Sequence, residues 1–448
     1  MNKLTEGSIL RALVKLSIPL ILTNILQTAY NLTDTFWVGR LGSGAVAAVS
    51  LAFPIVFMII SLGSGMAIAG SILVAKRYGA KDADAVAHIS TQTFFSVLSI
   101  SLLLAFLGYW IAPVLVGMMK VEPAVYNEAV AYLKITFMGL PPLFTYLTFQ
   151  SLMRSIGNVK LPFYIVLSTV LLNLALDPLF IFGWKDIVPA AGVKGAAIAT
   201  VGTQILSALI GLYILFKGKQ GIKICLSDYR PDFSVIKELF KLGFPVSIEQ
   251  VSRALGIFMM VLLVTHFGTM VLASYGIGSR ILSFVIIPAF GLGMATSTLV
   301  GQNIGAKQYD RVKKTLQLSL KIGFGTLTVI GLLLFVFAEE VAAFFIPGDT
   351  ATIQESAVFI KSLSVSFGFL GILIVLMGAF RGAGKTKISM LLALFSVWLL
   401  RFPLAYYLGY QTDMKHFGIW ISYPITNILT AIAGLILLIR HHWFDGEE

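Results

Sequence analysis

Twelve apolar runs of about 20 residues or more dominate the sequence and limit what the chain can fold into. A run of about 20 apolar residues is long enough to cross a bilayer as a helix. Because a bilayer offers no water to backbone polar groups, such runs are expected to be helical. The sequence therefore predicts an all-α membrane protein with twelve transmembrane helices. Their approximate ranges are 13–38, 45–75, 89–113, 126–153, 162–184, 192–217, 240–265, 271–301, 316–338, 353–380, 388–409 and 417–440.

The composition excludes a water-soluble globule. Of the 448 residues, 57% are hydrophobic and 12% are charged, whereas a soluble domain has about 25% charged residues. The net charge is +12, but the basic residues gather in short connections between apolar runs, which is not typical of a nucleic-acid groove. The first run lacks a small-residue cleavage site and continues to about Val38, so it is interpreted as a helix and not as a signal peptide.

The basic residues also predict the orientation of the chain. The two terminal segments and every second connection hold about 22 of the 33 Lys and Arg residues, and the opposite connections hold about five. Lys and Arg are retained on the cytoplasmic side of membrane proteins. We therefore expect a multi-pass protein of the cell membrane with both termini in the cytoplasm.

The two halves of the sequence repeat each other. "LSIP" at 16–19 corresponds to "LGFP" at 242–245, and "LVAKRYGAK" at 73–81 corresponds to "LVGQNIGAK" at 299–307, with the same offset along the chain for both pairs. Such self-similarity indicates duplication. Because six spans return the chain to its starting side, the halves should be related by a pseudo-two-fold axis along the membrane normal. The predicted domains are an N-lobe of six helices (1–217), a cytoplasmic linker (218–239) and a C-lobe of six helices with a short tail (240–448).

Two features that suggest other chemistry are weak. "RGAGKT" at 381–386 resembles the end of a phosphate-binding loop, but Ala379 stands where that loop needs glycine and no strand precedes it, so a tight basic turn is expected. Cys225 is the single cysteine, and His441 and His442 are the only adjacent histidines, which argues against a disulfide or a structural metal site. Neither an enzyme nor a bound cofactor is expected.

Two aspartates lie inside apolar runs of the first half. Asp34 lies in "NILQTAYNLTDTFWV", and Asp177 lies in "LLNLALDPLFIF" with Asn173 four residues earlier on the same helical face. Pro178 leaves a backbone carbonyl without its helical donor. Ionisable groups in membrane spans usually mark ion or proton paths, so these groups suggest a small-cation site. The alternative is that they only join helices, but the second half has Leu404 or Ala405 in place of Asp177 and no acid in place of Asp34.

Charged residues also occur in the runs of the second half. Glu249 and Arg253 are four residues apart and are expected to form an ion pair on one helix. Arg280 and Arg401 have no partner in the nearby sequence. They are expected to line a water-filled cavity or to meet acids on other helices.

Several of these motifs together resemble the multidrug and toxic compound extrusion (MATE) transporters, and most closely their DinF-like prokaryotic branch. The motifs are "YNLTDTFWVGRLG", "GSILVAKRYGAK", "LMRSIGNVK", "LNLALDPLFIFGW" and "GVKGAAIAT", and the resemblance extends over both halves. It implies a cation site in the N-lobe formed by Asp34, Asn173, Asp177 and Thr200. It also places Gln27, Tyr30 and Tyr132 near that site.

The resemblance also bears on the C-lobe. Arg280 matches a basic residue of the eighth span in this branch, and Arg280 and Glu249 are candidates for the substrate cavity. Relatives with a C-lobe cation site have an acid eight residues after the proline of the seventh span, where this chain has Arg253. This departure favours the N-lobe for the coupling ion.

The function expected from these observations is secondary active multidrug export. The chain would exchange organic cations, amphipathic drugs or other xenobiotics for Na⁺ or H⁺, in the lipid bilayer and as a monomer. The alternative is a flippase for lipids or lipid-linked sugars, in which Arg253, Arg280 and Arg401 would recognise phosphate. A membrane enzyme or a channel is disfavoured, because the sequence has neither a catalytic spacing nor a filter-like repeat.

Overall fold

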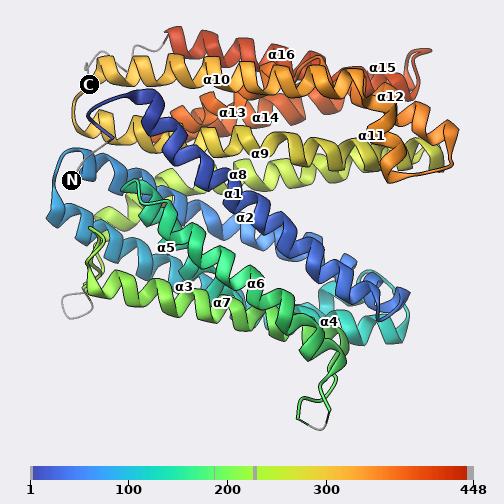
Figure 1. Cartoon of the computed structure of the whole chain (residues 1–448), viewed down its shortest axis with the longest axis horizontal. Helices are drawn as coiled ribbons and strands as arrows, with labels where there is room; N and C mark the ends of the chain where they lie inside the picture. Colours follow the sequence, from blue (N-terminus) through green and yellow to red (C-terminus); the bar gives the residue numbers. More distant parts are fainter. Residues whose placement is uncertain (1–3, 186, 226–229, 441–448) are drawn as a thin grey trace. The chain divides into compact units, whose positions relative to one another are not determined.

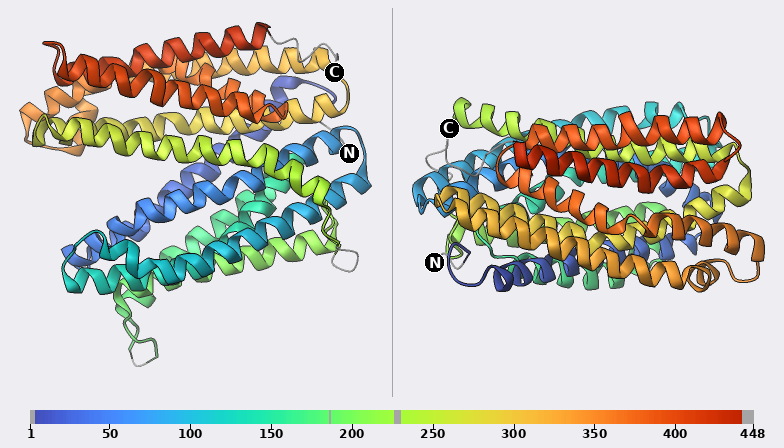
Figure 2. Two further views of the ribbon diagram at one scale, coloured as in Figure 1. Left: turned by 180° about the vertical axis from the view of Figure 1, so that it is seen from behind. Right: turned by 90° about the horizontal axis from the view of Figure 1, so that it is seen from above.

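The structure is a computed structural model that describes residues 4–185, 187–225 and 230–440. Part of the predicted linker and the predicted tail, with His441 and His442, lie outside these residues. Helices form nearly all of the described chain (Figures 1 and 2). Each run of the sequence becomes helical, as one helix or as consecutive helical segments, because a helix satisfies its own backbone polar groups within a bilayer.

The first half of the chain contains seven helices within the described residues. They are α1 (Ile9–Gly39), α2 (Ser43–Gly79), α3 (Ala83–Gly117), α4 (Pro123–Met138), α5 (Leu140–Ser155), α6 (Lys160–Phe182) and α7 (Gly192–Lys217). The second half contains α8 (Phe233–Thr265), α9 (Thr269–Gly305), α10 (Tyr309–Val336), α11 (Ala338–Phe345), α12 (Thr350–Ser364), α13 (Phe367–Gly382), α14 (Thr386–Leu394), a π-helical segment (Phe395–Arg401), α15 (Phe402–Tyr410) and α16 (His416–Arg440). Because α8 begins at Phe233, the predicted linker 218–239 includes its first turns.

Within the described residues, ten helical stretches are each long and apolar enough to cross a membrane, and two bent pairs bring the total to twelve if each pair is one span. Two of the predicted ranges correspond to the bent pairs. The runs 126–153 and 353–380 are not single straight helices, because α4 and α5 meet at 45° and α12 and α13 meet at 52°. The first bend has a local cause, since two prolines that lack backbone donors follow Leu140, the first residue of α5.

The repeat is visible in the backbone conformation. Lys81 and Lys307, which end the repeated motifs "LVAKRYGAK" and "LVGQNIGAK", both adopt the left-handed conformation, with φ of 62° and 58°. In the next equivalent turn Gly157 and Gly384 have φ of 84° and 78°. The turn at Gly384 belongs to "RGAGKT" and follows α13 directly, so the expectation of a tight turn there is confirmed.

The helices form two compact units, and each unit has its own hydrophobic core. One unit contains residues 22–247, and the other contains residues 1–21 and 248–448. The limits lie inside α1 and α8, at positions that correspond in the repeat. The units thus differ from the predicted lobes 1–217 and 240–448 at the first helix of each half. Residues 1–21 of α1 belong to the unit of the second half, and the part of α8 up to residue 247 belongs to the unit of the first half.

Close packing of small residues explains where these segments belong. In unit 22–247, a Cβ added to Gly65 of α2 would lie 2.4 Å from the carbonyl oxygen of Gly243 in α8. In the other unit, a Cβ on Gly291 of α9 would lie 3.2 Å from the carbonyl oxygen of Ser17 in α1. Small residues let membrane helices approach this closely. The beginning of α8 therefore packs on α2, and the beginning of α1 packs on α9.

Candidate functional site

The aspartate of the first span lies against the seventh helix. Thr200 of α7 donates a hydrogen bond from Oγ1 to Oδ2 of Asp34 in α1, at 3.2 Å. Asp34 is partly exposed. Its other oxygen, Oδ1, is buried and has no hydrogen-bond partner among the described residues.

The second aspartate lies on α6, and its side chain is fully buried. Asn173, one turn earlier, donates a hydrogen bond from Nδ2 to Oδ1 of Asp177, at 2.9 Å. The predicted placement of these two residues on one helical face is therefore observed. Pro178 lies inside α6, directly after Asp177, and interrupts the backbone hydrogen bonds of the helix.

The two carboxyl groups are close enough to interact directly. Three buried oxygens in this cluster have no hydrogen-bond donor among the described residues: Oδ1 of Asp34, Oδ2 of Asp177 and Oδ1 of Asn173. Buried polar atoms in folded proteins nearly always have a partner, and an ion is one way to supply it. Hard cations prefer oxygen ligands of this kind. The cluster can therefore hold either a small cation or a proton shared between the carboxyl groups.

Two tyrosines lie beside the aspartates. The hydroxyl of Tyr30 in α1 lies 2.9 Å from Oγ1 of Thr203 in α7, and it also donates to the carbonyl oxygen of Thr200 at 3.5 Å. Tyr132 of α4 lies within electrostatic range of both carboxyl groups. Thr203 was missed by the sequence analysis, although its position three residues after Thr200 places it near the same face of α7.

Gln27 is the third residue that was predicted to lie near this site. Its side chain is exposed, one turn before Tyr30 on α1. None of the hydrogen bonds described for the aspartates involves it.

The second half has a different polar cluster, centred on Glu249 of α8. Glu249 is fully buried and accepts a hydrogen bond from Arg253 at 2.8 Å, which confirms the expected ion pair. Arg381 of α13 also bonds to both of its carboxylate oxygens, and Ser389 donates to Oε2 at 2.8 Å. The contribution of Arg381 was missed, because that residue is 132 positions further along the chain.

The remaining arginines of the second half differ from each other. Arg401, at the end of the π-helical segment, lines a cavity of about 240 Å³ together with Arg253. Arg280 of α9 is exposed, and it is not among the residues that line this cavity. Glu249 does not line it either.

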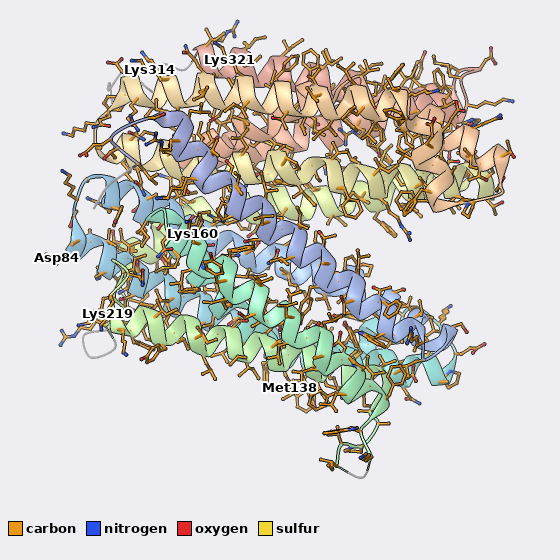
Figure 3. The ribbon with its side chains drawn as sticks, viewed as in Figure 1. Asp84, Met138, Lys160, Lys219, Lys314 and Lys321 are labelled. Atoms are coloured by element: carbon orange, nitrogen blue, oxygen red, sulfur yellow. The ribbon has the colours of Figure 1, made fainter. Side chains whose placement is uncertain are left out.

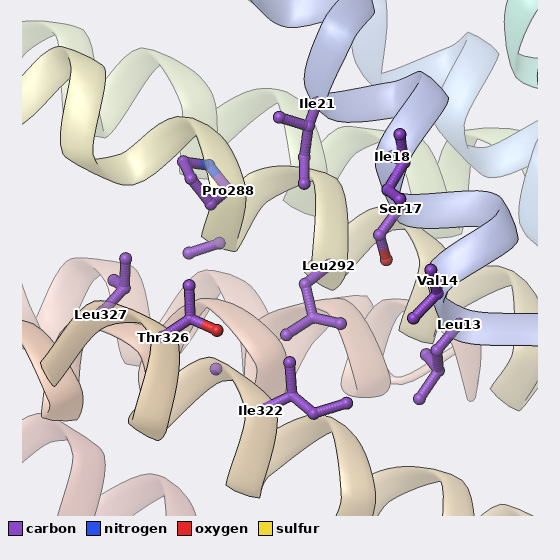
Figure 4. A pocket seen from close by; sticks show the side chains of 12 residues that line it. Leu13, Val14, Ser17, Ile18, Ile21, Pro288, Leu292, Ile322, Thr326 and Leu327 are labelled. Atoms are coloured by element: carbon purple, nitrogen blue, oxygen red, sulfur yellow. The ribbon is translucent and has the colours of Figure 1, made fainter. Parts of the chain in front are cut away.

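A second cavity, of about 200 Å³, lies beside the first part of α1 in the unit that contains residues 1–21 and 248–448. Figure 4 shows Leu13, Leu292 and Leu327 among its walls, with Ser17 and Thr326 as the labelled hydroxyl residues. Its lining contains no charged side chain. This cavity therefore offers no ligand set for an ion.

No group of three His, Cys, Asp or Glu side chains suited to a metal ion occurs in the part of the chain that the structure describes. The cluster around Asp34 has two carboxylates and neutral oxygens, which differs from the sets that hold Zn²⁺.

Comparison with known proteins places the chain among transporters. The MatE family model matches residues 19–179 and 245–407. The chain is 29% identical to the "Probable multidrug resistance protein YoeA" of Bacillus subtilis, over 99% of this chain and 95% of that protein. It is 26% identical to the "Probable multidrug resistance protein NorM" of Thermotoga maritima, over 97% and 93%. A solved structure of a multidrug resistance MATE family transporter in the outward-facing conformation is similar with a TM-score of 0.92 and 25% identity, over 100% of this chain and 99% of that one.

Proposed function

Because the chain belongs to the MatE family, we propose that it is a secondary active multidrug exporter that exchanges organic cations or other xenobiotics for Na⁺ or H⁺. The curated relatives named above carry the description "multidrug resistance protein". The proposed transport proceeds by alternating access across the cell membrane, without a cofactor.

The observation that carries the proposal is the buried carboxyl pair of α1 and α6. Asp34, Asp177 and Asn173 each present an oxygen that no donor among the described residues satisfies. Two such carboxylates are not stable together without a cation or a proton to offset their repulsion. Ion binding at this place therefore has a direct electrostatic reason.

Coupling follows if the pair is arranged differently in the inward-facing and outward-facing states. An ion drives a transporter only when its affinity differs between the two states. Asp34 and Asp177 belong to different helices, and Thr200 on a third helix bonds to Asp34. A shift of α1 against α6 and α7 would change the number of oxygens that the ion meets, and a cationic substrate would compete for the same charge.

We also propose that both termini lie in the cytoplasm and that the protein acts as a monomer. Figure 3 shows Asp84 and Lys219 at the same end of the unit formed by residues 22–247. The connection before Asp84 carries Lys76, Arg77 and Lys81 at or next to the end of α2. Basic groups gathered at one end of a helical bundle are expected on the cytoplasmic side.

The test is export from proteoliposomes with each ion gradient imposed separately. The purified protein is reconstituted, and the movement of ethidium is followed with a Na⁺ gradient alone, with a proton gradient alone and with neither. Transport that depends on one gradient supports the proposal and identifies the ion. Transport that is independent of both gradients contradicts it.

The flippase alternative has one specific observation in its favour, the basic lining of the cavity beside Arg401. It predicts movement of a fluorescent phospholipid between leaflets in the same vesicles. Lipid movement without ethidium movement would favour this alternative over multidrug export.

A further inference from the structure

The cavity beside Arg401 combines an apolar wall with basic groups. It lies within the unit formed by residues 1–21 and 248–448 and has a volume of about 240 Å³. Apolar side chains such as Met260, Ile286 and Leu370 form much of its lining, while Arg253 and Arg401 supply its charged groups. No carboxylate lines it. Pockets for small molecules have this general make-up, with many apolar groups and a few polar ones.

Arg401 has donors that no group in the described part of the chain uses. Its Nε donates to Oγ1 of Thr426 at 3.2 Å, one terminal nitrogen donates to Oδ1 of Asn427 at 2.7 Å, and its guanidinium lies 4.5 Å from the ring centre of Tyr423. A guanidinium has five N–H donors. The described residues provide Arg401 with neutral partners and no carboxylate, so the positive charge is held in place but not neutralised.

The backbone also sets this residue apart. Arg401 ends the π-helical segment Phe395–Arg401, between α14 and α15. Single π-helical turns inside α-helices occur often at functional sites, because they redirect side chains away from the regular helical positions.

The other basic groups of this region leave an excess of positive charge. Arg253 and Arg381 share a single carboxylate, that of Glu249. Arg401 adds a further guanidinium to the cavity lining, and Glu249 is the one carboxylate bonded to Arg253 and Arg381. The cavity lining therefore combines a net positive charge with apolar surface.

The repeat relates some residues of this cavity to residues of the first half that lie at or near Asp34. At the offset that relates "LVAKRYGAK" to "LVGQNIGAK", Gln27 corresponds to Arg253 and Asp34 corresponds to Met260, both of which line the cavity. At the slightly shorter offset that relates Gly195 to Gly418, Thr200 corresponds to Tyr423, which also lines it. The cavity thus has Met260 and Tyr423 at the positions that Asp34 and Thr200 occupy in the first half.

We propose that this cavity binds a small amphipathic anion, with a carboxylate, sulfonate or phosphate on the free donors of Arg401 and an apolar body against Met260 and Leu370. Arginine pairs with such oxyanions through two parallel hydrogen bonds. The proposal goes beyond cation-coupled export and does not rest on it, since it concerns equilibrium binding in the other unit. Both a dissolved aromatic acid and a single-chain lipid anion have the required chemistry.

The first experiment compares an anion and a cation of the same shape. The full chain is placed in nanodiscs of phosphatidylcholine, without any ion gradient, and equilibrium binding of radiolabelled 2-naphthoate and of 2-naphthylmethylammonium is measured. We expect saturable binding of 2-naphthoate and a loss of about tenfold or more in affinity for Arg401→Gln, because a charge-assisted hydrogen bond is removed. Lys321→Gln removes an exposed cation of α10 (Figure 3) and should leave the affinity unchanged.

A second variant keeps the test valid if Arg401→Gln does not fold. Ser283 lines the cavity and is exposed, and its hydroxyl bonds to the carbonyl oxygen of Ser279 at 2.9 Å. Ser283→Asp should weaken 2-naphthoate binding by placing a negative charge on the cavity wall. Ser362→Asp is the matched control, because Ser362 makes the same type of bond at 2.9 Å on α12 and does not line the cavity.

The source of the anion is assigned by competition. Dodecyl phosphate is added to the bilayer. If it displaces 2-naphthoate, a lipid anion is a ligand of the cavity; if 2-naphthoate stays bound, the ligand is a dissolved acid. Both results support an anion site. The proposal is overturned if the wild type does not bind 2-naphthoate, if the cation binds with the same dependence on Arg401, or if neither Arg401→Gln nor Ser283→Asp weakens the binding.

Discussion

Asp34 of α1 accepts a hydrogen bond from Thr200 of α7, which lies 166 residues further along the chain. The bond uses one carboxylate oxygen and leaves the other buried without a donor among the described residues. A carboxylate in a membrane span has a high desolvation cost. We propose that a bound ion completes this half-satisfied geometry, and the substitutions of Asp34 and Asp177 described next test the proposal.

Asp34→Asn should abolish gradient-driven export without unfolding the protein. The change is nearly isosteric, and the amide oxygen can still accept the bond from Thr200, but the negative charge is lost. Export is measured in proteoliposomes at matched protein content, and the melting temperature in detergent reports folding. Asp84→Asn, an exposed site in the first turn of α3, is the matched control. Wild-type export by Asp34→Asn would exclude this residue from coupling.

Asp177→Asn should change the dependence of transport on pH or Na⁺ and not only its rate. If Asp34 and Asp177 share one ion, the double variant should lose less than the two single losses added together, because the same site is removed once. Rates are measured over a series of pH values and Na⁺ concentrations for both single variants and the double variant. Strictly additive losses, or an unchanged profile in Asp177→Asn, would show that the aspartates act separately.

Glu249→Gln should reduce stability more than it reduces transport by each folded molecule. The substitution leaves the guanidinium groups of Arg253 and Arg381 without a carboxylate in a buried place, which costs on the order of 3 kcal/mol. The melting temperature should fall, while transport normalised to folded protein should exceed that of Asp34→Asn. The reverse order of the two normalised rates would place the coupling site around Glu249.

Gly65→Ala should destabilise the unit formed by residues 22–247. A Cβ at this position would lie 2.4 Å from the carbonyl oxygen of Gly243, so α2 and α8 would have to separate. Gly276→Ala on α9 is the control, since no other atom lies within 4 Å of the added Cβ. Thermal unfolding of the two variants is compared with the wild type, and equal melting temperatures for both variants would contradict the close contact of α2 with α8.

The start of α8 should become less protected at acidic pH. Asp232 precedes the helix, accepts a hydrogen bond from the backbone of Ser234 at 2.9 Å, and contacts Nε2 of His88 at 2.9 Å. The hydrogen bond from His88, followed by the backbone bonds, lowers the pKa of Asp232 below its usual value. A lowered pKa means that this stabilisation is present above the unfolded pKa of about 3.9 and is lost as the pH falls through the lower, folded value.

Hydrogen exchange of the peptide that contains Ser234 measures this effect. At neutral pH, Asp232→Ala should exchange faster than the wild type at the start of α8, because the cap is missing. The difference should shrink as the pH falls below the carboxylate pKa. A difference that does not change between neutral and strongly acidic pH would show that the charge of Asp232 is not the cause.

The sequence predicts well the features that depend on hydropathy or on short spacing. The twelve apolar runs correspond to ten long helices and two bent pairs in the described chain. The bond of Asn173 to Asp177 and the ion pair of Glu249 with Arg253 follow from a spacing of four residues on a helix.

Contacts between distant helices could not be predicted in the same way. Thr203 and Arg381 complete the two polar clusters, but a helix that is apolar on all sides gives no signal for the direction in which each face points. The bend between α12 and α13 has no proline at its break, at Val365 and Ser366, so no local residue marks it. The packing of the beginning of α8 on α2 and of the beginning of α1 on α9 involves Gly65 and Gly291. The small size of a glycine permits close packing but does not specify which helix packs against it.

The exchanged segments bear on how such a chain arose and on how it folds. Residues 1–21 of the first half belong to the unit of the second half, and the start of α8 belongs to the unit of the first half. A single copy of the repeat on its own would therefore lack one segment of its unit. Two identical copies could form complete units only by exchanging these segments, as domain-swapped homodimers do. In this chain the two copies are joined covalently, and neither unit becomes complete during synthesis until the start of α8 has been made.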